Sequence, residues 1–287
     1  NPAEVSELAS ERLRSRDKKI EGTVALRHLL KAWDSLRPGL AGKRIVVFLD
    51  YDGTLVPIAP TPAQARTPAR TRNVLRRLAR EPGVSVAVVS GRSLKDVRKK
   101  VGLDSVTCAG NHGLELRGPG LRFSYPLPKR VSAALLDILR RLNGIRSDIP
   151  GIIIENKIYS LSFHYRLVKS ADLRRMRERF RKAVSPHVRL GRVVLKSGKK
   201  VYEVRPPVSW NKGRIALWFL SRLRKGKSPV LPIYIGDDLT DEDAFRALKG
   251  KGITVFVGSP GARRTAAVYY LRSPAEVLKT LKKLTDS

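Results

Sequence analysis

IVVFLDYDGTL, residues 45–55, is the stretch of this sequence from which the fold can be predicted. Its first five residues are apolar, as in a strand that is buried within a parallel sheet. Asp50 and Asp52 follow at alternate positions, and Gly53 and Thr54 suit a sharp turn. Open α/β sheets bind ligands at the carboxyl ends of their strands, so these carboxylates are candidates for a nucleophile or for ligands of a hard cation. A turn with both Asp residues merely solvated is the alternative for this segment alone.

Three further segments carry polar groups that suit phosphate or metal chemistry. VSVAVVS (84–90) and VLPIYIGDD (230–238) each predict a strand that ends in such groups, and WNKG (210–213) precedes an amphipathic stretch. The candidate residues at the ends of these segments or just after them are Ser90, Gly91, Arg92, Lys212, Asp237, Asp238 and Asp241. Each segment alone is a weak signal, since a charged residue after a strand usually begins a loop. All of them in this order are specific.

The segments around these motifs alternate between strand and helix patterns, which is typical of an α/β fold with a parallel sheet. The predicted strands are 45–49, 84–89, 106–109, 230–235 and 253–257. The predicted helices are 71–80, 94–101, 215–223, 242–248 and 274–283. These elements divide into two stretches, 43–123 and 206–287, which we expect to form one core. Residues 1–42 carry apolar residues at helical spacing, and we expect a helical extension there.

Residues 124–205 have a different pattern, in the order αββαββ, which predicts an antiparallel sheet backed by two helices and inserted into the core. The strand at 159–166 places Leu161 and Phe163 on one face and His164 and Arg166 on the other. The strands at 151–157 and 199–205 also have one face with acids and bases. A solvated outer face is the common explanation for such a pattern, but the mixture also suits the hydroxyl groups of a sugar.

DYDGT (50–54), SGR (90–92), NKG (211–213) and GDDLTDEDAF (236–245) resemble the motifs of the haloacid dehalogenase superfamily of phosphatases. Within it, the sequence is similar to the trehalose-6-phosphate phosphatases, because of AGNHG (109–113) and of three polar stretches in the insert. The resemblance extends from about residue 43 to the C-terminus. It implies a Rossmann-like core, an inserted α+β cap that selects the substrate, and a magnesium-dependent phosphatase acting on trehalose 6-phosphate.

We expect Asp50 to be the nucleophile, because a carboxylate is ionised at neutral pH and needs no activating base. Asp52 is the expected general acid and base. The expected phosphate-binding residues are Thr54, Ser90, Gly91, Arg92 and Lys212. The expected Mg²⁺ ligands are Asp50, Asp52 through its backbone carbonyl, Asp237, Asp238 and Asp241, with the order of Asp238 and Asp241 left open. The expected substrate-binding residues are His112, Glu155, Lys157, His164, Arg166, Lys199 and Glu203, where a structural role is the alternative for His112.

Other phosphatase substrates stay open at this stage. The same fold and mechanism would serve sucrose phosphate or a mannosyl- or glucosyl-glycerate phosphate, and residues of the cap decide between them. A phosphomutase would share the first motif but would have to retain the phosphoryl group. A trehalose-phosphate synthase is a candidate partner or fused domain, because the chain begins at Asn1 without an initiator Met.

The net charge of +33 raises a rival of another class, a nucleic-acid-binding protein. The basic residues, however, are spread over the polar faces of predicted helices, and aromatic residues make up only 6% of the chain, so no stacking platform is indicated. No apolar run is long enough to span a membrane, and the first residues of this sequence lack the apolar h-region of a secretory signal. A single cysteine, Cys108, excludes an internal disulfide, and we expect a cytoplasmic protein.

Overall fold

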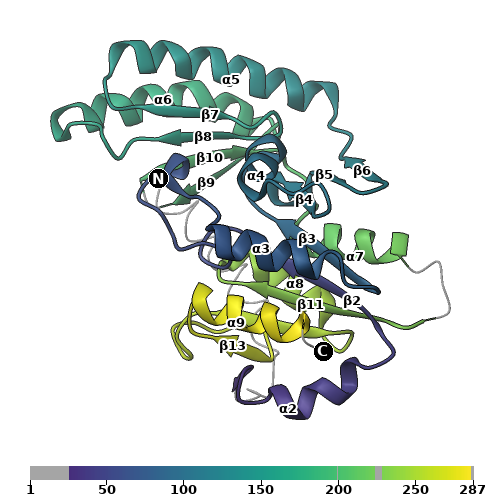
Figure 1. The fold of residues 1–287 in the computed structure, drawn as a ribbon. Coiled ribbons are helices and arrows are strands. Elements are labelled where there is room, and N and C mark those ends of the chain that lie inside the picture. The colour runs from purple at the N-terminus through teal and green to yellow at the C-terminus, as the bar shows by residue number, and fades with distance from the viewer. Residues whose placement is uncertain (1–25, 199, 224–227, 286–287) are drawn as a thin grey trace.

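The computed structural model describes residues 26–198, 200–223 and 228–285, which form a core and a cap, each built on its own sheet (Figure 1). The core sheet has nine strands in the order β1 (Arg27–His28), β13 (Tyr269–Leu271), β12 (Ile253–Val257), β11 (Val230–Gly236), β2 (Arg44–Leu49), β3 (Val84–Val89), β4 (Thr107–Gly110), β5 (Glu115–Gly118) and β6 (Leu121–Ser124). Neighbours from β1 to β4 are parallel, and β5 and β6 are antiparallel. The α/β prediction is therefore confirmed.

Helices cover both faces of the core sheet, as the predicted strand-helix alternation requires. One face packs against α3 (Ala69–Leu78), α4 (Leu94–Val101) and α9 (Pro274–Thr285), and the other against α7 (Lys212–Leu223) and α8 (Glu242–Leu248). In the central strand β2, Val47 and Leu49 belong to the first apolar cluster, and Val46 and Phe48 belong to the second. The apolar run at 45–49 is thus buried on both sides, which explains why it has no polar alternation.

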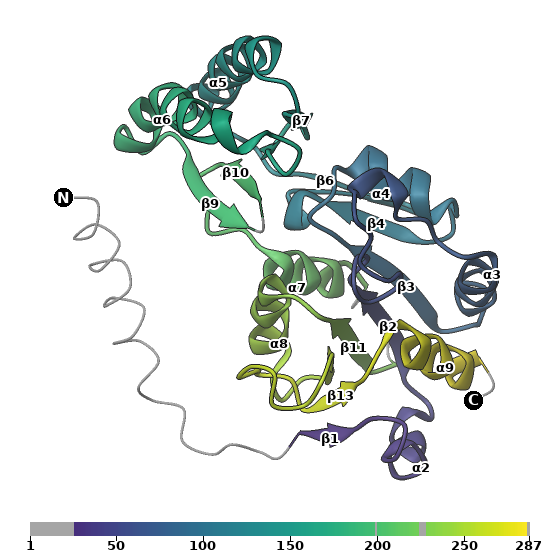
Figure 2. The same cartoon turned by 90° about the vertical axis from the view of Figure 1, so that its left-hand side faces the viewer.

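The cap lies between β6 and α7 in the chain and has the predicted order αββαββ. Its elements are α5 (Lys129–Asp148), β7 (Ile153–Asn156), β8 (Leu161–His164), α6 (Leu173–Arg189), β9 (Val194–Gly198) and β10 (Val201–Arg205). The strands form an antiparallel sheet in the order β7-β8-β10-β9. Phe163 of β8 and Met176 and Phe180 of α6 belong to one buried cluster. Both helices cover the outer side of this sheet, away from the core (Figures 1 and 2).

Several elements differ from the predicted ones. The hairpin β5–β6, which ends the core sheet, was not predicted, because Arg117 and Arg122 give its short strands little apolar alternation. Residues 1–25 of the expected helical extension lie outside the described residues. From residue 26 onward, the extension has a strand pair of β1 with β13, then the short helices α2 (Trp33–Leu36) and η1 (Arg37–Leu40). Burial of Leu29 and Trp33 in the core attaches this segment to the sheet.

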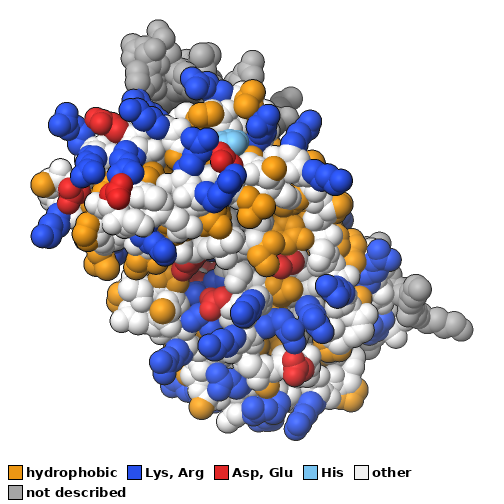
Figure 3. Space-filling model, turned by 90° about the horizontal axis from the view of Figure 1, so that it is seen from above, with side chains coloured by type: hydrophobic (Ala, Val, Ile, Leu, Met, Phe, Trp, Pro, Cys, Tyr) orange, Lys and Arg blue, Asp and Glu red, His pale blue; other side chains and the backbone are white. Residues whose placement is uncertain are grey.

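Basic side chains are dispersed over the outer face of the cap and alternate there with apolar and neutral groups (Figure 3). This distribution agrees with the sequence pattern, in which arginines occupy the polar faces of helices. Among the described residues, no helix has both the length and the apolar character needed to cross a membrane.

Candidate active site

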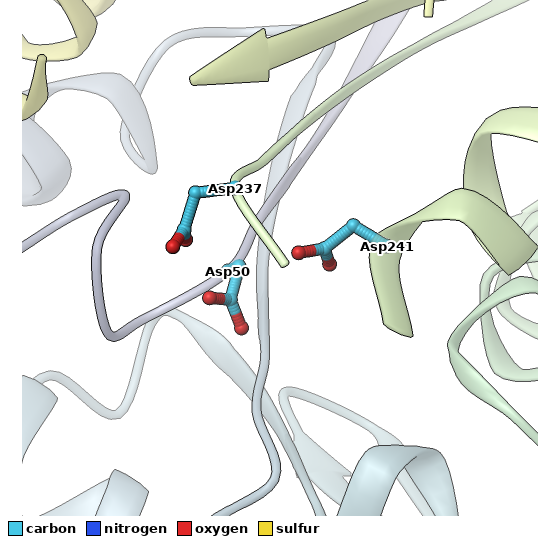
Figure 4. A group of neighbouring side chains, drawn as sticks. All are labelled: Asp50, Asp237 and Asp241. Carbon is cyan, nitrogen blue, oxygen red and sulfur yellow. The ribbon is translucent and has the colours of Figure 1, made fainter. Parts of the chain in front are cut away.

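Three carboxylates converge at the carboxyl edge of the core sheet (Figure 4). Asp50 directly follows β2 and Asp237 directly follows β11, and these two strands are neighbours in the sheet. Asp241 comes from the 3₁₀ turn η5 (Leu239–Asp241), which leads into α8. One oxygen from each of the three carboxylates lies within 4.8 Å of the others. The two strand ends at which the sequence places acids therefore form one cluster.

Lys212, the first residue of α7, supplies a positive charge to this cluster. Its Nζ donates to Asp50 Oδ1 at 2.7 Å and to Asp241 Oδ1 at 2.8 Å, and the side chain is 2% exposed. Burial alone would lower the pKa of Lys212, but the charges of Asp241 and Asp50 outweigh it and raise that pKa. The ammonium group therefore stays charged beside Asp50 at all physiological pH values. Asp241 also accepts a hydrogen bond from the hydroxyl of Tyr234, so its carboxylate is firmly oriented.

The donor set fits a hard divalent cation. Three carboxylates surround one ammonium group, so full ionisation would leave two uncompensated negative charges in a buried site. Burial raises the pKa of Asp50, against the opposing charge of Lys212, and burial raises the pKa of Asp237 to about 6. A cation with oxygen ligands would remove this penalty. Asp238 is exposed and lies outside the cluster, with one carboxylate oxygen accepting from the backbone N–H of Leu239.

The turn after β2 is shaped by its contact with Asp237. Gly53 has a φ of 85°, and a Cβ at that position would lie 2.0 Å from Asp237 Oδ2. Glycine is therefore needed there both for the backbone conformation and for space. Thr54 Oγ1 donates to Asp237 Oδ1 at 2.8 Å, so the structure places this predicted phosphate-binding hydroxyl against the carboxylate cluster.

Asp52, the expected general acid, is held by Arg92. The guanidinium group donates from Nε and Nη2 to the two carboxylate oxygens of Asp52, each at 2.6 Å. Arg92 also donates to Asp96 at 2.8 Å and to the carbonyl of Pro62 at 3.0 Å. This fork geometry fixes the orientation of the carboxylate much more strictly than a single contact would. The immediate partner of Arg92 is thus the Asp52 carboxylate.

The loop after β3 lies beside a second loop that carries His112. Ser90 is buried, and its Oγ accepts from the backbone N–H of Arg92 at 3.1 Å. The backbone N–H of His112 donates to the carbonyl of Ser90 at 2.9 Å, and a Cβ at Gly91 would lie 2.6 Å from His112 Cε1. Both ring nitrogens of His112 are buried without a hydrogen-bond partner among the described residues. Burial, followed by the charge of Arg205, lowers the pKa of His112 well below its usual value, so the ring is neutral.

The polar face of the cap sheet carries an ion-pair network that faces the core. Lys157 Nζ donates to Glu203 Oε1 at 3.2 Å and to the carbonyl of Gly91 in the core at 3.1 Å. Arg205 Nε donates to Glu203 Oε2 at 2.8 Å. Burial would raise the pKa of Glu203, but Lys157 and Arg205 lower it to about 2. This carboxylate therefore stays ionised and can accept hydrogen bonds from a ligand.

One cavity of about 840 Å³ joins these groups. From the core it is lined by Asp50, Asp52, Ser90, Gly91, Arg92, His112, Lys212, Asp237 and Asp238. From the cap it is lined by Glu155, Lys157, His164, Arg166 and Glu203, and Lys199 lies outside the described residues. Thr54 and Asp241 lie behind this lining. Ser162, Arg205 and residues 58–63 also line the cavity and were not predicted. The strand parity that selected Glu203 and His164 also points to Arg205 and Ser162.

The cavity has buried carboxylates on its core side and a polar, charged face on its cap side, an arrangement that suits a hydrolase of the haloacid dehalogenase type. A haloacid dehalogenase-like hydrolase from Bacteroides thetaiotaomicron, at 15% identity and a TM-score of 0.57, covers 84% of this chain and shares its fold. The trehalose-phosphatase family profile matches residues 48–275. The chain belongs to this family of phosphoric monoester hydrolases.

Relatives and solved structures agree with that membership. The chain is 38% identical over 258 residues to the trehalose-phosphate phosphatase of Mycobacterium avium, covering 86% of this chain and 64% of that protein. It is 35% identical over 273 residues to trehalose 6-phosphate phosphatase RA3 of Zea mays, covering 90% of this chain and 74% of that protein. The C-terminal domain of Candida albicans trehalose-6-phosphate phosphatase has a TM-score of 0.70 at 25% identity, covering 92% of this chain and 99% of that one.

Proposed function

We propose that this protein hydrolyses trehalose 6-phosphate to trehalose and phosphate. The observation that carries the proposal is the single cavity that has a carboxylate–lysine cluster on its core side and an ionised, sugar-compatible face on its cap side. A phosphate ester bound across it would direct its phosphoryl group to the core and its sugar hydroxyls to the cap. The family and the relatives named above support trehalose 6-phosphate as this ester.

In the proposed mechanism, Asp50 attacks the phosphorus atom and the sugar oxygen leaves, which gives an aspartyl-phosphate. Asp52 protonates the departing oxygen and then takes a proton from the water that hydrolyses the intermediate. Lys212 and Ser90 stabilise charge on the phosphoryl oxygens. Asp50, Asp237 and Asp241 would hold Mg²⁺, with the backbone carbonyl of Asp52 as a further candidate ligand. When bound, the ion neutralises negative charge on the phosphoryl group and its nucleophile.

The sugar would be selected by the cap. Glu155, Lys157, His164 and Glu203 line the upper part of the cavity, and ionised carboxylates accept strong hydrogen bonds from hydroxyl groups. Another disaccharide or glyceryl-sugar phosphate would meet the same core chemistry and differ only in these contacts. A panel of phosphorylated sugars separates these substrates, with phosphate release in the presence of Mg²⁺ as the readout.

The decisive experiment for the chemistry compares Asp50→Asn with a matched control, Asp104→Asn. Asp104 is exposed and forms an ion pair with Arg98, away from the carboxylate cluster. We expect Asp50→Asn to abolish phosphate release. It should also abolish the phosphoryl label that remains on the protein when turnover of a radiolabelled substrate is stopped with acid. Asp104→Asn should retain both. Normal turnover by Asp50→Asn, or full activity in excess EDTA, would overturn the proposed mechanism.

A further inference from the structure

Asn111 of the core has its whole side chain committed to contacts around the boundary with the cap. It is 1% exposed. Its Nδ2 donates to Glu115 Oε1 of the core at 2.7 Å and to the carbonyl of Lys157 of the cap at 2.8 Å. Its Oδ1 accepts from Ser160 Oγ of the cap at 2.9 Å. Nδ2 faces two acceptors and Oδ1 faces one donor, so all three contacts agree with a single orientation of the amide.

The cap residues that Asn111 contacts form the turn between β7 and β8. Ser160 is buried, and Asn111 Oδ1 is the acceptor for its hydroxyl. Lys157, whose carbonyl Asn111 holds, extends its ammonium group to Glu203 and to the carbonyl of Gly91. A side chain of the core therefore sets the backbone position of a residue that lines the sugar side of the cavity.

Asn111 is also hydrogen-bonded to the loop on the phosphate side of the cavity. Its backbone N–H donates to the carbonyl of Arg92 at 2.7 Å, and the next residue, His112, donates to the carbonyl of Ser90. Its φ of 49° lies in the left-handed region, which Asn tolerates better than most residues. The loop that carries Asn111 thus connects the phosphate-binding segment to the cap turn through direct hydrogen bonds.

We propose that Asn111 is a positioning residue that latches the cap turn 157–160 onto the phosphate-binding loop, and so holds Lys157 and Glu203 over the phosphate. This inference rests on the proposed function for its kinetic consequences but not for its structural ones. Without the latch, the cap would close less completely over the core. Recognition of the sugar would then weaken, while the chemistry at Asp50 would remain.

Two variants remove the latch from opposite sides. Asn111→Gly deletes the side chain while glycine tolerates the positive φ, so the backbone is not strained. Ser160→Ala deletes the partner hydroxyl in the cap. The control is Ser170→Ala, an exposed serine of the cap in the 3₁₀ turn Ser170–Asp172 that precedes α6. Circular dichroism and thermal unfolding verify that each variant is folded.

The first measurement is of cap position and needs no substrate. Spin labels at Arg80→Cys in the core and Arg146→Cys in the cap report the distance between the two parts by pulsed dipolar spectroscopy. Burial raises the pKa of the native Cys108 to about 12, so it should not react with the label. We expect a narrow distribution in the parent and in Ser170→Ala, and a broader one in Asn111→Gly and Ser160→Ala. A distribution that both latch variants leave unchanged would overturn the proposal, whatever the substrate is.

The second measurement is the split between sugar phosphate and aryl phosphate. We expect each latch variant to lose roughly tenfold in kcat/KM for trehalose 6-phosphate, mostly through KM, as fits the loss of one or two buried hydrogen bonds. Hydrolysis of a small aryl phosphate should change little. The double variant should lose no more than Asn111→Gly alone, because both changes break one contact. Equal losses on both substrates would mean that Asn111 supports only the core. Additive losses in the double variant would mean that Asn111 and Ser160 do not act through one contact. Either outcome would overturn the proposal.

Discussion

At the scale of single residues, the site depends on carboxylates whose surroundings differ. Asp50 and Asp241 contact the Lys212 ammonium group in a buried cluster, whereas Asp52 accepts two hydrogen bonds from the guanidinium group of Arg92. In the proposed mechanism, this contrast separates the attacking group, Asp50, from the proton-transferring group, Asp52. Because Arg92 donates to both oxygens of Asp52, a substitution of Asp52 also changes the surroundings of Arg92. A test of the role of Asp52 therefore needs a control at Arg92's other carboxylate partner.

We predict that Asp52→Asn slows hydrolysis of an alkyl phosphate by roughly 10²–10⁴-fold, the usual contribution of a general acid. An activated aryl phosphate should lose much less, because its leaving group needs no proton. The control is Asp96→Asn, which removes the other carboxylate on the Arg92 guanidinium and should affect both leaving groups alike. Steady-state rates on the two substrates check this. Equal losses in Asp52→Asn would exclude Asp52 as the acid.

A second residue-scale prediction concerns pH. The folded, metal-free pKa of Asp237 is about 6, above the ordinary value of 3.8. The folded state therefore binds the proton more tightly, and this contribution to the stability of the metal-free protein falls as pH rises from about 4 to 6. Mg²⁺ requires the ionised carboxylate, so the increase in melting temperature on adding Mg²⁺ should be larger at pH 7.5 than at pH 5. Asp237→Asn should lose most of the increase at pH 7.5, and an increase independent of pH would contradict the assignment.

At the scale of elements, the turn after β2 is the most constrained part of the site. Gly53→Ala would place a methyl group against Asp237, so we expect loss of Mg²⁺ binding and activity. Gly120→Ala is the matched control, since Gly120 also has a positive φ, of 63°, but an added Cβ would meet nothing within 4 Å. The control should cost about 1 kcal/mol of unfolding free energy from strain alone, measured by urea denaturation. Equal effects of the two changes on Mg²⁺ titrations would show that the contact with Asp237 is unimportant.

Much of this architecture could be predicted from periodicity. The unbroken apolar run of β2, the stripe of α6 and the αββαββ order of the cap each have a regular pattern, and all three are present. The hairpin β5–β6 lacked such a signal, because edge strands with exposed arginines do not alternate clearly. The contacts of Arg92 with Asp52 and of Asn111 with Ser160 join distant segments of the chain. Spacing in the sequence carries no information on such pairs, so only the fold could reveal them.

At the scale of the whole molecule, residues of both the core and the cap line the cavity, and in the proposed function each side has a separate role. The core side should decide whether phosphate is released, and the cap side should decide from which sugar. Glu203 is the clearest case, since its lowered pKa keeps it ionised between Lys157 and Arg205 while it lines the cavity.

We predict that Glu203→Gln lowers kcat/KM for trehalose 6-phosphate by about tenfold to a hundredfold, the effect of losing one charged hydrogen bond to a buried hydroxyl. Hydrolysis of a small aryl phosphate should change little. Glu178→Gln, an exposed substitution on the outer surface of α6, is the control and should leave both rates alone. The ratio of the two activities is the measurement, and a parallel fall on both substrates would assign Glu203 to the fold or the chemistry instead.

The position of β2 between β3 and β11 has a consequence for biosynthesis. Arg44 of β2 pairs with Val230 of β11, and the entire cap is translated between them. A nascent chain can thus form β2, β3 and the cap while the other edge of β2 is still open, without Lys212 or Asp237. Until β11 leaves the ribosome, this apolar central strand has an unpaired edge, so we expect the growing chain to need protection from aggregation.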